Sequence, residues 1–254
     1  MEHFETMFYD TVDPKELRFT TPFKALFVGA SSCGKSELIA KILEHKAELI
    51  DKPEFDYVGY YYPGKSLTAS RQNYIDRLSR TFTNLEPHEG LPDIDDLASI
   101  DGSKLIIVDD LYADVVKNIS MHDLMTIHAH HSNISLLITA QNFFTQGKYS
   151  KTLLRNYTDI VLFDAKMDRQ ILDIISSQMF PGGKRFIPLI MEWLRENVKN
   201  VHERYIWIDS HPNSKVPEFL RVRSNVVATE KNPYEITFIP PSTNYIAAKK
   251  YGLL

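Results

Sequence analysis

The stretch that decides the fold of this chain is Gly29-Ala30-Ser31-Ser32-Cys33-Gly34-Lys35-Ser36. It satisfies the pattern G-x-x-x-x-G-K-[ST] at every fixed position. An apolar run at residues 25–28 precedes it, and an apolar stripe at helical spacing follows between Leu38 and Ile50. A strand, a glycine-rich loop and a helix in this order suit phosphate binding, because the loop N–H groups and the positive end of the helix converge. The alternative is a glycine turn that binds nothing.

The motif predicts a role for each of its residues. Lys35 places a positive charge between the β- and γ-phosphates, and the Ser36 hydroxyl is a ligand of Mg²⁺. The substrate and cofactor expected from the pattern are therefore ATP and Mg²⁺. The residues predicted to contact the nucleotide are Gly29, Ala30, Ser31, Ser32, Cys33, Gly34, Lys35, Ser36 and Glu37.

A second element supplies acidic side chains. Residues 105–108 are apolar and lead directly into Asp109 and Asp110. A buried parallel strand would place both carboxylates at its carboxyl end, where such sheets bind ligands. We expect Asp109 to hold Mg²⁺ and Asp110 to activate or orient the attacking water. The alternative is a strand that ends in a solvated turn.

A third apolar run, residues 134–140, ends in Gln141. Its amide could bond the γ-phosphate or the attacking water, or it could simply cap the strand. Along the chain, one expected strand, 57–62, lies between the P-loop strand at 25–28 and the acidic strand at 105–108. The run 134–140, which ends in polar side chains, follows as a sensor strand. This order predicts the additional-strand type of P-loop NTPase. A guanine-specific Asn-Lys-x-Asp is absent, which disfavours a GTPase.

The remaining pattern predicts an α/β fold with a mostly parallel central sheet, flanking helices and C-terminal edge strands. Strands are expected at 57–62 and 160–163, and Ser120 is expected to cap a helix. We predict a single domain, 1–254, with a core at about 20–183 and an extension at 184–254. The expected extension begins with a helix at 186–198 and continues with strands at 205–208, 219–222 and 236–239.

Composition narrows the class of protein. The chain has 254 residues, 29 Lys plus Arg against 33 Asp plus Glu, and a net charge of −4. Apolar residues reach 43%, too many for a mainly disordered chain. Cys33 is the single cysteine, so no intrachain disulfide can form. No signal peptide and no apolar run near the roughly 20 residues of a membrane helix is present. We expect a soluble, intracellular protein.

The segment after the acidic pair resembles a known family. It contains His130-His131, then Asn133-Ile134-Ser135, Gln141-Asn142 and the strand Val161-Leu162-Phe163. This order, together with Asp109-Asp110-Leu111, is similar to that of the packaging ATPases of double-stranded DNA viruses. These are the poxvirus-like and polinton-like members of the FtsK–HerA superfamily. The resemblance covers roughly residues 20 to 180.

The resemblance implies an ATP-driven motor that moves double-stranded DNA into a viral capsid, built as a homo-oligomeric ring. A capsid or portal protein is a possible partner, and the host cytoplasm or nucleus, or the virion, is the implied location. It also implies an arginine that completes a neighbour's site. The family usually has arginine where Lys151 stands, so Arg155, Lys151 and Arg169 are candidates. Each also fits a solvated surface charge.

Two other functions remain open from the sequence, namely a P-loop small-molecule kinase and an assembly protein that binds ATP without turnover. The DNA contact is equally open. Its candidate residues are Lys65, Arg71, Arg77 and Arg80, or Lys184 and Arg185, or Arg221 and Arg223.

Overall fold

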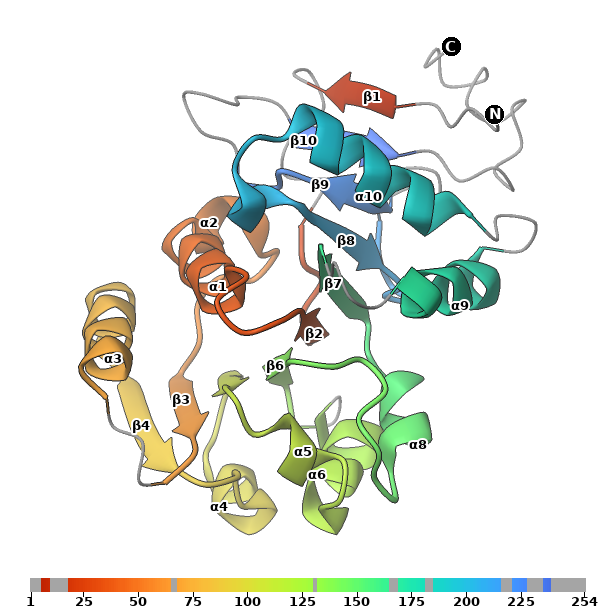
Figure 1. Cartoon of the computed structure of the whole chain (residues 1–254). Coiled ribbons are helices and arrows are strands. Elements are labelled where there is room, and N and C mark those ends of the chain that lie inside the picture. The colour runs from red at the N-terminus through yellow and green to blue at the C-terminus, as the bar shows by residue number, and fades with distance from the viewer. Residues whose placement is uncertain are drawn as a thin grey trace.

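The computed structural model describes residues 6–9, 18–64, 68–129, 132–164, 169–180, 185–215, 221–227 and 235–238. Predictions that concern Lys65, His130, His131 and Lys184 lie outside these ranges. In the described part the strands form one ten-stranded sheet, in the order β1-β10-β9-β8-β7-β2-β6-β5-β3-β4 (Figure 1). No helix among the described residues is long and apolar enough to cross a membrane.

The sheet has a parallel half and an antiparallel half. The parallel strands are β2 (Lys24–Val28), β3 (Tyr57–Tyr62), β4 (Leu85–Glu89), β5 (Lys104–Val108), β6 (Ile134–Ala140) and β7 (Asp159–Phe163). The antiparallel strands are β8 (Tyr205–Asp209), β9 (Val222–Ser224), β10 (Glu235–Phe238) and β1 (Thr6–Tyr9). The predicted α/β fold, with C-terminal strands extending a mostly parallel sheet, is confirmed.

Alternation along the buried strands sends side chains to two separate cores. In β2, Ala25 and Phe27 join one apolar cluster, whereas Leu26 and Val28 join the other. The first core is covered by α1 (Lys35–Glu44), α2 (Lys46–Leu49) and α3 (Ala69–Thr81). The other face packs against α4 (Ile94–Ser99), α5 (Tyr112–Val115), α6 (Ile119–Asp123), η2 (Leu124–His128), α8 (Ser150–Leu154), α9 (Arg169–Met179) and α10 (Phe186–Asn197).

Several predicted boundaries differ from those in the structure. The helix expected from Ser120 begins earlier, because the Asn118 side chain accepts a hydrogen bond from the Met121 N–H. The apolar stripe that follows the P-loop is divided at His45 into α1 and α2. Of the strand expected at 219–222, residues 219 and 220 lie outside the described part, and the described strand there is β9, Val222–Ser224.

Two strands escaped prediction altogether. β4 is polar and contains Pro87, which a strand tolerates at the edge of a sheet, where β4 lies. β1 pairs with β10, more than 200 residues further along the chain, so no local sequence pattern predicts it.

Candidate functional site

The P-loop occupies the carboxyl end of β2, at the centre of the sheet. The Gly29 N–H continues the pairing of β2 with β6 by donating to the Ala140 carbonyl at 3.0 Å. A Cβ on Gly29 would lie 2.7 Å from the Cβ of Phe163, so the neighbouring strand β7 leaves no room for a side chain. Gly34 has φ of +110°, which disfavours any residue with a Cβ.

Lys35 is the first residue of α1, and its side chain folds back over the loop. Its Nζ donates to the carbonyl oxygens of Gly29 at 2.6 Å and Ala30 at 2.9 Å. No side chain caps the N-terminus of α1. The loop therefore combines a buried ammonium group with unsatisfied helix N–H groups, the arrangement that binds phosphate.

The acidic pair lies at the end of β5. Asp109 is 7% exposed, and its carboxylate accepts hydrogen bonds from the Tyr60 hydroxyl at 3.0 Å and the Thr139 hydroxyl at 2.8 Å. Burial, followed by repulsion from Asp110, raises the pKa of Asp109 above its usual range. A divalent cation beside Asp109 would offset both effects, because it favours the charged carboxylate.

Thr139 couples the acidic pair to β6. Its hydroxyl donates to Asp109 and accepts from the Asp110 N–H at 2.9 Å. Asp110 has φ of +58°, a conformation uncommon outside glycine, and this hydrogen bond helps to hold it. The motifs in the sequence do not point to Thr139. The one clue in the sequence was a hydroxyl residue near the end of the apolar run that forms the strand next to the acidic strand.

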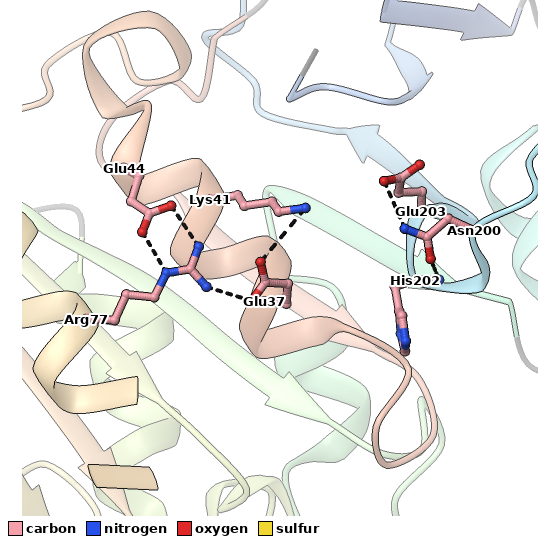
Figure 2. A network of polar contacts seen from close by, with 7 residues as sticks. All are labelled: Glu37, Lys41, Glu44, Arg77, Asn200, His202 and Glu203. Carbon is pink, nitrogen blue, oxygen red and sulfur yellow. Dashed lines mark hydrogen bonds and ion pairs between the residues drawn. The ribbon is translucent and has the colours of Figure 1, made fainter. Parts of the chain in front are cut away.

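Arg71, on the first turn of α3, reaches the same carboxylates. Its guanidinium lies 3.1 Å from Asp110 and 4.0 Å from Asp109, over the ring of Tyr62. Arg77 on the same helix bonds Glu37 at 2.6 Å and both oxygens of Glu44 (Figure 2).

Three of the arginines considered for DNA contact pair with carboxylates of this chain, and full burial of Arg223 makes the expectation wrong for that residue. Arg71 and Arg77 pair with carboxylates beside the P-loop. Arg223 is fully buried, packs over Trp207 and pairs with Glu235. Arg80 and Arg185 remain exposed. Arg221 is partly buried and donates to the Ser214 carbonyl.

The P-loop, the acidic pair and α3 surround one cavity of about 760 Å³. Tyr74 lines it, and its buried hydroxyl has no hydrogen-bond partner among the described residues. The open N-terminus of α1, the orphaned hydroxyl and the raised pKa of Asp109 all fit a bound phosphate and its cation. The predicted site residues among those that line the cavity are Ser31, Ser32, Gly34, Lys35, Ser36, Glu37, Asp109 and Asp110.

Other predicted site residues lie outside the cavity lining. Gln141 is exposed and directly follows β6. Arg155 is exposed at the C-terminal end of α8, and Lys151 is exposed on that helix. Cys33 is half-buried, and burial raises the pKa of its thiol. Arg169 begins α9, and its side chain is outside the described part.

The C-terminal extension makes a contribution to the cavity that the sequence did not predict. Asn200 and His202, in the turn before β8, line the same cavity. No local pattern signals this, because the turn is placed by the pairing of β8 with β7.

No protein-family model matches this chain, and no curated protein matches its sequence. Among solved structures, the chain is similar to the genome packaging NTPase B204 from Sulfolobus turreted icosahedral virus 2 in complex with AMP. The TM-score is 0.46 and the identity 13%, over 76% of this chain and 94% of that one. B204 described as the DNA-packaging ATPase from Sulfolobus turreted icosahedral virus gives a TM-score of 0.43 and 11% identity, over 76% and 94% of the two chains. The flagellar accessory protein FlaH from Methanocaldococcus jannaschii is similar with a TM-score of 0.38 and 16% identity, over 57% of this chain and 72% of that one. At identities this low, none of the three assigns an activity to this chain.

Proposed function

We propose that this protein is a Mg²⁺-dependent ATPase that translocates double-stranded DNA. The observation that carries the ATPase part is the cavity in which Lys35 and Ser36 face the same space as Asp109 and Asp110. The sensor strand β6 lies between β2 and β5 in the sheet. It is hydrogen-bonded to the P-loop through the Ala140 carbonyl and to the acidic pair through the Thr139 hydroxyl. This arrangement suits hydrolysis of a phosphoanhydride.

The chain's own residues divide the work of that reaction. The P-loop N–H groups and Lys35 bind and orient the phosphates, and Ser36 and Asp109 are placed to hold Mg²⁺. When bound, Mg²⁺ offsets negative charge that develops on the phosphate oxygens. Asp110, more exposed than Asp109, accepts a proton from the attacking water or orients it. Arg71 places a guanidinium at this same end of the cavity.

DNA translocation and ring assembly rest on the order of motifs between Asp109 and Phe163. Arg155 is exposed and lies outside the cavity lining of its own subunit, as a residue that completes a neighbour's site would. In a ring it would approach the γ-phosphate held by a neighbour, where such arginines raise turnover by roughly 10³–10⁵. A capsid or portal protein would then be the partner that receives the DNA.

The test is phosphate release by the purified protein with Mg²⁺ and ATP, with and without double-stranded DNA. DNA should stimulate release, and Lys35→Ala should abolish it while the circular dichroism spectrum stays native. Transfer of phosphate to added nucleosides without DNA stimulation would favour the kinase. Tight ATP binding with no turnover under any condition would favour the non-hydrolysing assembly protein.

A further inference from the structure

The turn before β8 lies at the P-loop edge of the sheet, on the side away from the acidic pair. It consists of Asn200 and η3 (Val201–Glu203). Because β8 is antiparallel to β7, with Tyr205 opposite Phe163, the start of β8 meets the carboxyl ends of the parallel strands. In the sheet, β5 is two strands from β2 on one side and β8 is two strands from it on the other.

The turn packs directly on the P-loop. A Cβ on Gly34 would lie 3.1 Å from the His202 Cβ and 3.2 Å from the His202 carbonyl oxygen. Asn200 fixes the turn, since its side chain accepts from the His202 N–H at 3.1 Å and donates to Glu203 at 2.9 Å. Figure 2 shows His202 extending from the turn toward the loop, while Lys41 extends from α1 toward the turn.

The cavity is therefore bounded at one end by the acidic pair and Arg71, and at the other by His202 and Lys41. A triphosphate whose γ-phosphate lies beside Asp109 runs along the P-loop to the N-terminus of α1. Its nucleoside must then emerge on the far side of Gly34, where His202 is exposed. A flat imidazole at that point offers a stacking surface to a base.

We propose that the 200–203 turn is the nucleobase subsite of the nucleotide site, with the His202 ring stacked on the base and Asn200 positioning that ring. The inference rests on the proposed ATP site and extends it to the C-terminal extension. It also gives the extension a role: β8 is placed in the sheet so that the turn preceding it completes the cavity.

The test compares two ligands that differ in the nucleoside, namely a non-hydrolysable ATP analogue and inorganic tripolyphosphate, each with Mg²⁺. We expect His202→Ala to weaken the analogue about tenfold, a typical effect of losing one stacked base. Tripolyphosphate affinity should stay unchanged. Val201→Ala is the matched control, because Val201 is 52% exposed in the same turn and does not line the cavity.

A second variant tests the contact directly. In His202→Trp the analogue should bind at least as tightly as to the native protein, and it should quench the added indole fluorescence. Tripolyphosphate should cause no such quenching.

Unchanged analogue affinity in His202→Ala would overturn the subsite, as would an equal loss for both ligands or absent quenching in His202→Trp. Failure of the ATP site itself would look different, because Lys35→Ala would then leave the binding of both ligands unaltered.

Discussion

Replacing Thr139 with valine should weaken both the fold and the reaction, because one hydroxyl serves two carboxylate residues. Thr139 is 1% exposed, and valine keeps nearly the same shape. The change removes the 2.8 Å bond to Asp109 and the acceptor for the Asp110 N–H. A hydrogen bond to a charged group contributes about 2 kcal/mol. Loss of the hydrogen bond from the Asp110 N–H adds about 1 kcal/mol, the low end of the cost of an unsatisfied buried group. The cost is low because Asp110 is exposed and water can replace the hydroxyl.

We therefore expect Thr139→Val to lower the free energy of unfolding by about 3 kcal/mol at pH 8, measured by urea denaturation. The loss should shrink at acidic pH, because a protonated Asp109 no longer makes a charge-assisted bond. The Thr139 bond lowers the pKa of Asp109, so its removal should raise that pKa further. ATP turnover should fall in parallel, since Asp110 loses the bond that fixes its backbone.

Thr139→Ser is the control, because it keeps the hydroxyl and removes one methyl group. It should retain most of the stability and turnover. If Thr139→Val unfolds within about 0.5 kcal/mol of the native protein and hydrolyses ATP normally, the hydroxyl does not organise the acidic pair.

The other predictions concern the acidic pair, the subunit interface and a buried carboxyl. Asp109→Asn should lower Mg²⁺-dependent nucleotide affinity, measured by calorimetry, together with turnover, measured by phosphate release. Asp110→Asn should keep the affinity and slow only turnover in the same two assays. Normal turnover in Asp110→Asn would mean that another residue is the base. Arg155→Ala should bind ATP but lose turnover by roughly 10³, and mixing it with Asp110→Asn subunits should restore part of the activity. No recovery on mixing would contradict a shared site. Burial, followed by repulsion from Asp209, raises the pKa of Asp159 from 3.8 to about 7. The folded state then binds more protons, so the free energy of unfolding should fall as pH rises from 3.8 toward 7 and level off above it. Asp159→Asn should flatten that slope in urea titrations at several pH values, and an unchanged slope would refute the assignment.

The P-loop, the acidic strand and the central strands could be predicted because each is a local pattern. Five apolar runs became parallel strands with ends within about one residue of those expected, since a strand buried on both faces is apolar throughout. The order of those strands along the chain predicted the additional-strand type of P-loop NTPase, and the structure shows that β6 lies between β2 and β5 in the sheet.

What the sequence by itself determined was therefore the class of fold and the phosphate-binding chemistry, because motif spacing and apolar periodicity depend on neighbouring residues. Only the tertiary structure decided which distant groups complete the site. The acidic pair is contacted by Thr139 from β6, Arg71 from α3 and Tyr60 from β3. Gly34 is contacted by His202, which lies more than 160 residues further along the chain. These contacts depend on strand order and on the antiparallel addition of β8, which arise from long-range pairing and leave no periodic trace in the residues themselves.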